Sequence, residues 1–484
     1  MKLTYAPDAR PGLVKTIIFA LQQVLAILAA TIVVPVIVNT SPQGIAKGAE
    51  MSQSAALFGA GAGTLVYLLF TKFKSPVFLG SSFAFIGSMC AAFGGAVSAS
   101  VGYLGIIIGA IFAGLVYVVI AFVVKRVGTG WIDKIMPAAV IGPTVAVIGL
   151  SLAGNAIGDL SKGSVLNVLG APTASPYVAL ICGLVTLFTT IACSVYGKKM
   201  LKMIPFIIGI VAGYAVAAIF TVIGIVAKVP ELQVINFGLF QNMQWLPEFT
   251  FVKAFDGFKN LGDFGSYIGT VAVAYIPVAF VVFAEHLADH KNISSIIEHD
   301  LLKDPGLDKT LLGDGVGSMV GAFFGGCPNT TYGESVGCVA ISGNASIVTI
   351  VTAAIICILA SFFAPFVTFL ATIPSCVMGG VCVALYGFIA VSGLKMIQKV
   401  DLEDNKNLFV VSVILIAGVG GMVVNFGNVT LTSVACALIL GILTNVLTHW
   451  KKDGKEEKEV AVVDAPAEEV ADEPAQDCDN DAIE

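Results

Sequence analysis

Long apolar runs separated by short polar segments dominate this chain. Most runs approach the roughly 20 residues that an α-helix needs to cross a hydrocarbon core about 30 Å thick. They therefore predict an all-α, polytopic membrane protein. The twelve runs lie at 14–38, 54–72, 101–124, 131–154, 174–195, 203–227, 268–292, 308–325, 345–371, 374–395, 406–424 and 428–449.

Two further apolar stretches are short and interrupted. The first, 78–98, contains LGSSFAF at 79–85, and the second, 327–343, contains PNTTYGES at 328–335. Irregular backbone at membrane depth is tolerated only where it is buried in protein or lines a cavity. Counting both stretches as crossing or re-entrant elements gives fourteen transmembrane segments.

The basic residues support this count. Cytoplasmic segments of membrane proteins are enriched in Lys and Arg. With both termini in the cytoplasm, fourteen spans place 21 of the 26 Lys and Arg residues on the cytoplasmic side. Removing either interrupted stretch alone destroys this alternation, so we expect both stretches to be part of the membrane domain.

A weak internal repeat indicates two related halves. Pro137, Val140 and Gly142 recur with the same spacing at 374, 377 and 379, in the fifth and twelfth spans. The interrupted stretches are the third and tenth spans, so both pairs lie seven spans apart. An odd offset reverses the orientation, which predicts an inverted repeat of seven plus seven spans. Paired broken segments mark the substrate site of many transporters.

Composition excludes several classes. The chain is 57% hydrophobic and 12% charged, with a mean hydropathy of +0.92, whereas soluble domains have about 25% charged residues. The net charge of −6 comes from the acidic tail, 451–484, which we expect to be disordered. Nothing indicates nucleic-acid binding. The ten cysteines lack metal-binding spacing, so we expect no metal or cofactor.

Ionisable residues inside predicted spans are few. They are Glu285, His286, Asp289, Asp314 and Glu334, and intramembrane charges generally mark function. Glu334 lies at the start of a predicted half-helix, where unpaired N–H groups favour a carboxylate or a ligand carbonyl. Simpler roles stay open: a helix cap for Glu334 or Asp314, and an interface cluster for Glu285 and its neighbours.

These groups fit a planar, uncharged ligand. The two broken spans offer carboxylate acceptors, backbone N–H donors and an aromatic face at Phe83. Uracil has matching N–H and C=O groups. An anionic substrate would require Arg or Lys, and no predicted span interior contains one, which argues against an anion transporter or channel. The segment EHLADH does not match HExxH, and no Ser–Lys signature supports an enzyme.

At these residues the chain resembles the nucleobase–ascorbate (nucleobase:cation symporter-2) transporters, and among them the bacterial uracil carriers. The resemblance covers nearly the whole chain except the acidic tail. Besides LGSSFAF and PNTTYGES, it rests on AEH at 284–286, DPGL at 304–307 and VMGG at 377–380.

The resemblance implies a core domain that moves against a gate domain, with short strands in spans three and ten. It also implies a homodimer formed through the gate domains in the plasma membrane. The expected parts are a cytoplasmic N-terminus, 1–13; core, 14–125 and 265–371; gate, 126–227 and 372–450; an extracellular loop, 228–264; and a cytoplasmic tail, 451–484.

The resemblance also implies a substrate site. Glu285 and Glu334 would accept hydrogen bonds from the base, and the backbone N–H groups of Phe83 and Gly333 would donate to its carbonyls. The side chains expected to shape the pocket are Phe83, Tyr332, Ala30 and Tyr386, and those expected to support it are Gln23, Asn329, Asp314 and His286.

One position departs from the family pattern. Relatives commonly have Gln-His in the first span, where this chain has Gln22-Gln23. A glutamine donates hydrogen bonds but carries no proton charge. The expected proton carriers are therefore Glu285 and Glu334. The expected function is uracil import by proton symport, with import of xanthine or another purine as the alternative.

Overall fold

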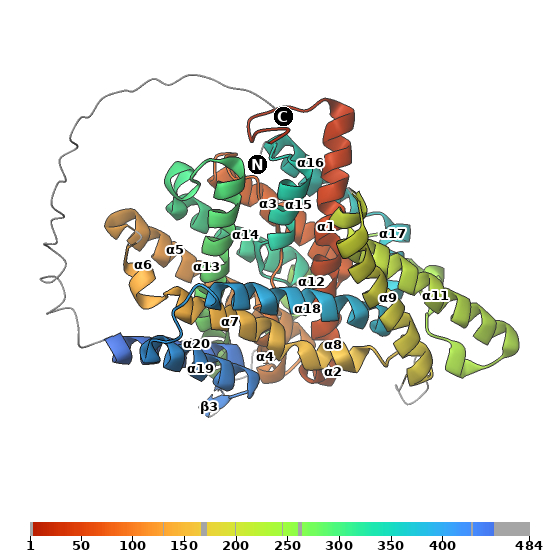
Figure 1. Ribbon diagram of the computed structural model, residues 1–484. Helices are drawn as coiled ribbons and strands as arrows, with labels where there is room; N and C mark the ends of the chain where they lie inside the picture. The colour runs from red at the N-terminus through yellow and green to blue at the C-terminus, as the bar shows by residue number, and fades with distance from the viewer. Residues whose placement is uncertain are drawn as a thin grey trace, which may run out of the picture.

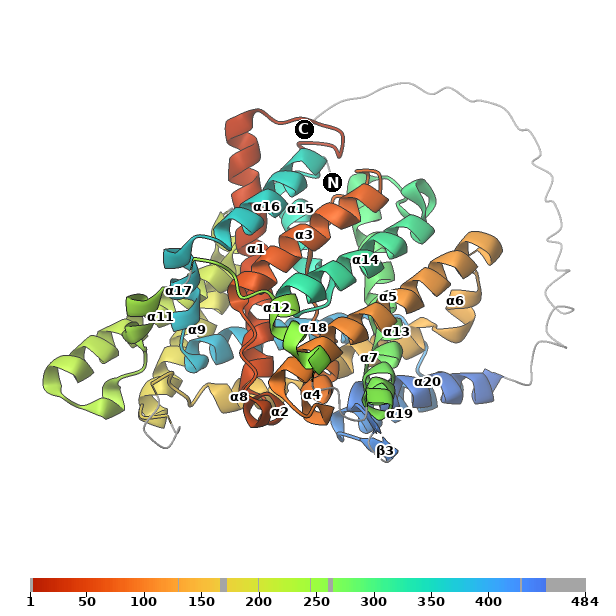
Figure 2. The ribbon, with the colours of Figure 1, turned by 180° about the vertical axis from the view of Figure 1, so that it is seen from behind.

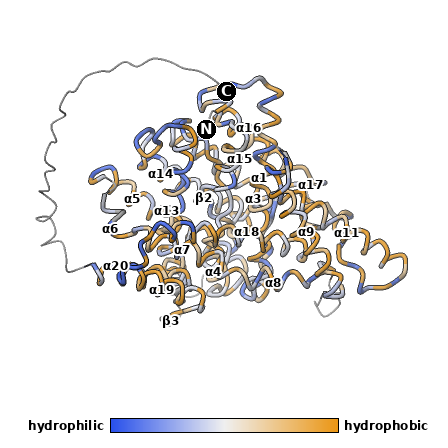
Figure 3. Tube along the Cα trace, viewed as in Figure 1, coloured by the Kyte–Doolittle hydropathy of each residue, from blue (hydrophilic) through white to orange (hydrophobic). Residues whose placement is uncertain are grey.

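The computed structural model describes residues 3–128, 130–165, 172–198, 200–243, 245–259, 264–426 and 429–449. The expected disordered tail at 451–484 lies outside these ranges. Within them the protein is mostly α-helical (Figure 1), and hydrophobic residues cover most of the helices, whereas hydrophilic residues gather at their connections (Figure 3).

Eight helical segments in the described ranges are long and apolar enough to cross a membrane. This agrees with the expectation of a polytopic helical membrane protein. They are α1 (Leu13–Thr40), α3 (Gln53–Phe70), α5 (Ala99–Val127), α7 (Ala138–Ser151) with α8 (Ala153–Asp159), α9 (Pro176–Tyr196), α11 (Pro205–Ala227), α13 (Phe264–Ile297) and α18 (Ser375–Ile397).

The remaining apolar segments are bent or short. The helices α16 (Ile347–Ala360) and α17 (Ala364–Thr372) form one stretch bent by 83°. The short elements are α2 (Pro42–Lys47), α4 (Ile86–Gly95), α6 (Gly130–Ile135), α10 (Met200–Met203), α15 (Gly333–Ser342), α19 (Asn405–Val419), α20 (Ser433–His449) and a hairpin of β3 (Val424–Phe426) and β4 (Val429–Leu431).

Each interrupted stretch forms a strand followed by a half-helix. Strand β1 (Leu79–Ser81) precedes α4, and β2 (Asn329–Thr331) precedes α15. The strands pair antiparallel, with Leu79 opposite Thr331. Gly80 is required at this crossing because a Cβ atom there would lie 2.4 Å from the Tyr332 ring. Segments about 250 residues apart are thus joined by backbone hydrogen bonds at the centre of the fold.

Asn329 fixes the second strand between two helices. Its side chain donates a hydrogen bond to the Gly59 carbonyl at 2.9 Å, and the Ser318 hydroxyl donates to the Asn329 carbonyl. Gly63 and Gly321 leave room for this side chain, because a Cβ at either position would lie within 2.4 Å of it. Asn329 therefore anchors β2 between α3 and α14, and its support of a substrate site stays a prediction.

The helices form two packing groups. In the first, α14 (Leu307–Gly325) packs against α3 and α5, while α13 packs against α5, and α16 against α1 and α3. Figure 2 shows α3, α14 and α5 side by side. In the second group, α18 packs on α7 and α9, α9 on α11, and α19 on α7 and α20. Pro137 and Pro374 are the N-caps of α7 and α18, as their spacing predicts.

The long segment 228–259 contains η1 (Pro230–Leu232), η2 (Phe237–Asn242), α12 (Thr250–Phe255) and η3 (Asp256–Lys259). The Phe249 and Phe251 rings pack against Phe323 and Phe324 of α14. Lys253 forms a salt bridge with Glu248 at 2.6 Å. This part of the segment is therefore attached to the first packing group, whereas Trp245 and Phe255 are exposed.

Candidate functional site

Three carboxylates from two elements meet at one cavity. Glu285 and Asp289 lie four residues apart on α13, a spacing that puts both on one helical face. Glu334 lies in the first turn of α15, directly after β2. All three line a cavity of 340 Å³, and each is half-buried. The cavity combines acidic acceptors with the N-terminus of a half-helix, whose first N–H groups have no partner within the helix.

Asp289 is held in place by the strand that precedes Glu334. The Thr331 hydroxyl donates a hydrogen bond to Asp289 Oδ2 at 2.8 Å. The sequence shows Asp289 as an intramembrane charge, but it does not predict a role for this residue in the site. The spacing of four residues between Glu285 and Asp289 could have indicated this role. In a regular helix such as α13, residues at i and i+4 lie on the same face.

The opposite wall of the cavity comes from the second packing group. Phe206 of α11 and Phe388 of α18 supply aromatic surface, and Lys202 of α10 supplies a positive charge. Lys202 and Phe388 are exposed, so the cavity opens to the outside of the protein at this end. Lys202 lies between the predicted spans 174–195 and 203–227. The sequence therefore gives no indication that it lines the same cavity as the three carboxylates.

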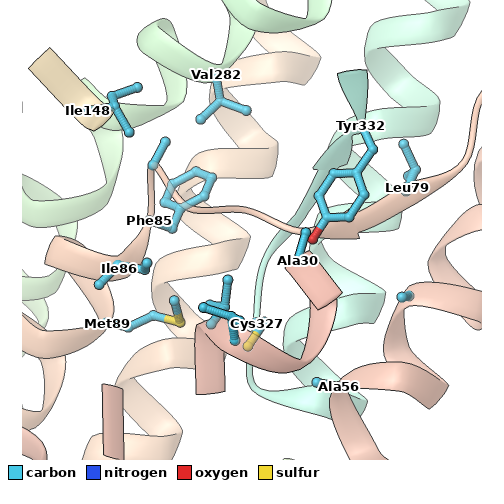
Figure 4. Packing of buried hydrophobic residues seen from close by; sticks show 14 of the residues in the cluster. Ala30, Ala56, Leu79, Phe85, Ile86, Met89, Ile148, Val282, Cys327 and Tyr332 are labelled. Carbon is cyan, nitrogen blue, oxygen red and sulfur yellow. The ribbon is translucent and has the colours of Figure 1, made fainter. Parts of the chain in front are cut away.

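The other residues expected to shape the pocket lie elsewhere. Ala30, Tyr332 and Tyr386 are buried and are not among the residues that line this cavity. The Tyr332 hydroxyl donates to the Ser81 carbonyl at 2.8 Å, and Figure 4 shows it next to Ala30. Phe83 lines a second cavity of 290 Å³ together with Ile148 of α7.

Phe83 and Tyr386 contact each other across the two packing groups. Their ring centroids are 5.8 Å apart in an edge-on arrangement. Tyr386 precedes Ile389, a lining residue of the first cavity, by one helical turn on α18. The ring pair therefore lies between the segment that follows β1 and helix α18 of the second packing group.

Gln23 is bonded to the half-helix that carries Glu334. Its side-chain amide donates a hydrogen bond to the Ser335 hydroxyl, and the Phe78 N–H donates to the same hydroxyl at 3.0 Å. Gln23 is buried in α1, and Ser335 directly follows Glu334. Gln23 therefore contacts Ser335, the residue next to Glu334.

A buried polar network lies behind the carboxylates. His286 Nδ1 is 2.8 Å from Asp314 Oδ2, and its Nε2 is 3.0 Å from the Thr310 hydroxyl. His290 bonds the His286 carbonyl through Nδ1 and the Tyr67 hydroxyl through Nε2, at 2.8 Å and 2.6 Å. His286, His290 and Asp314 are all fully buried, so the network links α13 with α14 and α3 and does not reach the cavity directly.

The cavity side chains have no cationic partner within ion-pair distance in the described ranges. None of the salt bridges found there includes Glu285, Asp289 or Glu334. Across the part of the chain that the structure describes, no cluster of His, Cys, Asp or Glu could hold a metal ion. The arrangement can accept hydrogen bonds or protons at three carboxylates and donate hydrogen bonds from the start of α15.

Comparisons with known proteins agree with a transport role. Residues 14–427 match the sequence model of the Permease family. A uracil permease of Bacillus subtilis is 36% identical over 444 residues, which cover 90% of this chain and 93% of that protein. A uracil permease of Escherichia coli is also 36% identical, over 438 residues that cover 90% of this chain and 91% of that protein.

A solved structure shares the fold at low sequence identity. The transmembrane domain of the cyanobacterial bicarbonate transporter BicA superposes with a TM-score of 0.55 at 15% identity. The match covers 92% of this chain and 100% of that domain. At this identity the likeness concerns the arrangement of helices and gives no information on the substrate.

Proposed function

Because this chain belongs to the Permease family, together with the uracil permeases, we propose that it imports uracil by proton symport. The membrane location and the transport class follow from family membership and from the apolar helices. The observation that carries the more specific proposal is the meeting of Glu285, Asp289 and Glu334 at one cavity beside the N-terminus of α15.

Uracil fits the hydrogen-bonding groups of this cavity. Its two N–H groups are donors, and the carboxylates of Glu285 and Glu334 are acceptors. Its two carbonyls are acceptors, and the backbone N–H group of Gly333 at the start of α15 is one proposed donor, as at other helix N-termini that hold polar groups. The second proposed donor is the backbone N–H group of Phe83, which lines the 290 Å³ cavity and contacts Tyr386. The 340 Å³ of the cavity lies within the range of about 300–1,000 Å³ usual for small-molecule sites.

Purines are the alternative substrates because they carry similar donor and acceptor groups on a larger ring system. The cavity volume alone does not select between the two classes. Anions fit less well, because three acidic side chains line the cavity against one lysine, Lys202, near its open end. A net negative site disfavours an anionic ligand by Coulomb repulsion.

Proton coupling follows from the same carboxylates. Three acidic groups around one cavity repel one another when all are ionised, and partial burial removes part of their solvation. Binding of a neutral base is then favoured when Glu285 or Glu334 carries a proton. In this proposal the proton leaves on the cytoplasmic side together with the substrate, so that an inward proton gradient drives uptake.

Alternating access is the proposed transport movement. We assign the core domain to 14–125 and 265–371 and the gate domain to 126–227 and 372–450, joined by the loop 228–264. The two packing groups support this division, since α3, α5, α13, α14 and α16 contact one another, and α7, α9, α11 and α18 do the same. The cavity lies between them, so relative movement of the groups changes its access.

The proposed topology has fourteen spans in two inverted halves, with both termini in the cytoplasm and the protein in the plasma membrane. The antiparallel pairing of β1 with β2 supports it, because these strands begin the matching third and tenth spans. Supporting evidence also comes from the equivalent N-caps, Pro137 and Pro374. We further propose a homodimer formed through the gate domains.

Uptake by proteoliposomes tests this function. Purified protein is reconstituted, and accumulation of radiolabelled uracil is measured with and without an imposed inward proton gradient. Accumulation should require the gradient and should collapse when an ionophore dissipates it. Unlabelled uracil, thymine, xanthine and hypoxanthine are then added as competitors. Uptake that ignores the gradient contradicts symport, and stronger competition by xanthine than by uracil favours the purine alternative.

Glu334→Gln tests the site. Replacing the charged acceptor by a neutral amide oxygen weakens the hydrogen bond by about 1–1.5 kcal/mol, which corresponds to a roughly 5- to 13-fold weaker uracil affinity. Glu231→Gln is the matched control, because Glu231 lies in the exposed segment η1 far from the cavity lining. Equal affinities of the two variants, measured by calorimetry on folded protein, would remove Glu334 from the site.

A further inference from the structure

The Phe83–Tyr386 ring pair lies where the carboxylate cavity gives way to the smaller cavity of 290 Å³. On α7, Val145 lines the carboxylate cavity, whereas Ile148 lines the smaller one. Tyr386 packs on α7 at this level, because a Cβ atom at Gly149 would lie 2.4 Å from the Tyr386 carbonyl oxygen. Phe83 itself lines the smaller cavity. The two rings therefore stand between neighbouring cavities.

The two cavities extend toward opposite ends of the helices that they share. Ala26 of α1 lines the carboxylate cavity, and Ser41, the C-cap of the same helix, lines the smaller cavity. Fifteen residues of helix separate these two positions, which is about 22 Å. On α18, the carboxylate cavity continues past Tyr386 to Met396 and reaches Lys202 of α10. In the proposed topology, Ser41 lies at the extracellular side, and Met396 and Lys202 lie at the cytoplasmic side.

The smaller cavity has a polar but uncharged lining. Hydroxyl and amide groups can both donate and accept hydrogen bonds, so they can receive a neutral base without the removal of a charge from water. None of the lining residues that the structure describes is charged. The polar ones are Ser41, Gln43, Ser151, Asn155, Thr432 and Ser433.

The two packing groups also meet inside the smaller cavity. Gly87 of α4 and Thr432, which directly precedes α20, both line it. A Cβ atom at Gly87 would lie 3.8 Å from the Thr432 Cβ. Helix α4 packs on α5 and α13 of the first group, and α20 packs on α7 and α19 of the second. The Gly87–Thr432 contact therefore joins the same two groups as the ring pair does.

We propose that the smaller cavity is the outer entrance for the substrate and that the Phe83–Tyr386 and Gly87–Thr432 contacts form a closed outer gate. This inference rests on the proposed function and topology. Phe83 and Gly87 belong to the first packing group, and Tyr386 and Thr432 to the second. Separation of the groups at these two contacts opens the way from the entrance to the carboxylate cavity, which in this structure opens only at the opposite end.

The side from which thiols can be modified tests the entrance. Cys90 lines the smaller cavity and is half-buried, and Ser392 lines the carboxylate cavity and is exposed. The parent protein and Ser392→Cys are placed in right-side-out and inside-out vesicles and treated with a membrane-impermeant methanethiosulfonate. Mass spectrometry of the peptides identifies the modified cysteines. Cys90 should react from the extracellular side, and the thiol of Ser392→Cys should react from the cytoplasmic side.

A reversible crosslink tests the outer gate. Gly87→Cys combined with Thr432→Cys places two Cβ atoms at the 3.8 Å found between these positions, which is about the mean separation in disulfides. Cys90→Ser is included to prevent pairing with that thiol. Copper–phenanthroline oxidises the pair, and molecular oxygen takes up the two electrons and two protons. Uracil uptake should be lost on oxidation and return with dithiothreitol, whereas uracil binding to the crosslinked protein in detergent should persist.

The matched controls are the two single variants, Gly87→Cys and Thr432→Cys, each with Cys90→Ser. Under the same oxidant they should keep their uptake, because neither can join the two groups. Uptake that continues after complete crosslinking, or failure of the folded double variant to crosslink, overturns the outer gate.

The labelling result stands separately from the crosslink. Modification of Cys90 from the cytoplasmic side, or from neither side, overturns the entrance, and it decides the matter even where the double variant does not fold. Failure of the proposed function has a different signature, which is absence of uracil uptake by the parent protein. Thiol labelling and disulfide formation do not require a transported substrate.

Discussion

His286 Nδ1 lies 2.8 Å from Asp314 Oδ2, and both side chains are fully buried. This contact joins α13, which carries Glu285 and Asp289, to α14. Thr310 bonds the other ring nitrogen of His286 at 3.0 Å. The imidazole is therefore held from both sides, and with it the face of α13 that points to the cavity. A buried pair of this kind positions the site without contacting the ligand.

Breaking this pair should destabilise the protein. Asp314→Ala leaves the His286 nitrogen without a buried partner, and loss of one member of a buried pair costs about 3–5 kcal/mol. Asp314→Asn keeps a hydrogen-bond acceptor and should cost less, about 1–3 kcal/mol. Denaturation in detergent micelles measures the difference, with Asp256→Asn as an exposed control. Equal losses for Ala and Asn would show that the hydrogen bond contributes little.

Asp289→Asn should move the pH dependence of uptake to lower pH. Removing one of three negative charges at the cavity weakens the attraction of the remaining carboxylates for protons. A transporter that must be protonated to bind substrate then needs more acid outside. Initial uptake rates across a pH series measure the shift. Thr331→Val, which removes only the hydrogen bond to Asp289, provides a milder comparison, and an upward shift in Asp289→Asn contradicts the model.

Lys202→Met should have the opposite effect. Lys202 is the positive side chain among the cavity-lining residues, so its removal strengthens proton binding by the carboxylates and moves the uptake curve to higher pH. Lys202→Arg keeps the charge and should leave the curve in place. Salt distinguishes the electrostatic effect from a steric one, because ionic strength screens an exposed charge. If Lys202→Arg shifted the pH dependence of uptake as Lys202→Met does, the shape of the side chain would be responsible and not its charge.

Gln23→Leu should weaken substrate binding without abolishing folding. The Gln23 amide bonds Ser335, next to Glu334, and a typical hydrogen bond contributes about 0.5–1.5 kcal/mol. The expected loss of uracil affinity is therefore about 2- to 13-fold. Gln23→His introduces the residue that the family resemblance leads us to expect, keeps a hydrogen-bond donor and should bind uracil more like the parent protein does. Binding calorimetry on all three proteins checks the order.

Gly80→Ala should disrupt the crossing of the two broken spans. An added methyl would lie 2.4 Å from the Tyr332 ring, so β1, β2 or the ring must move. Gly87→Ala is the matched control, because the nearest atom to its added methyl lies 3.5 Å away, an ordinary contact. Yield of monodisperse protein and uracil affinity report the effect. Normal behaviour of Gly80→Ala would mean that the strand pairing tolerates displacement.

Much of the site could be read from local sequence. Glu334 was placed on a half-helix after Pro328 and Asn329, and the structure has α15 begin at Gly333. The apolar run 268–292 predicts a helix at Glu285, and the residue lies in α13. Both predictions depend on the backbone preferences of neighbouring residues and on the cost of a charge among apolar residues, which are local properties.

Contacts between distant segments could not be predicted in this way. The bond of Asp289 with Thr331 joins α13 to β2, and that of His286 with Asp314 joins α13 to α14. No periodic pattern in the sequence indicates which side chains face each other across elements. The 83° bend between α16 and α17 and the hairpin of β3 with β4 were also missed. The apolar run 345–371 continues through the bend, so hydropathy gives no signal where the chain turns between α16 and α17.

By itself, the sequence determined that this protein is a membrane-embedded transporter with two interrupted apolar stretches and acidic residues inside its helices. The reason is that each segment that crosses the bilayer must be long enough and apolar enough by itself, so its own sequence reveals it. Tertiary structure alone decided that Asp289 and Lys202 join Glu285 and Glu334 at one cavity. These residues become neighbours only when one helix group packs against the other, and that packing depends on the whole fold.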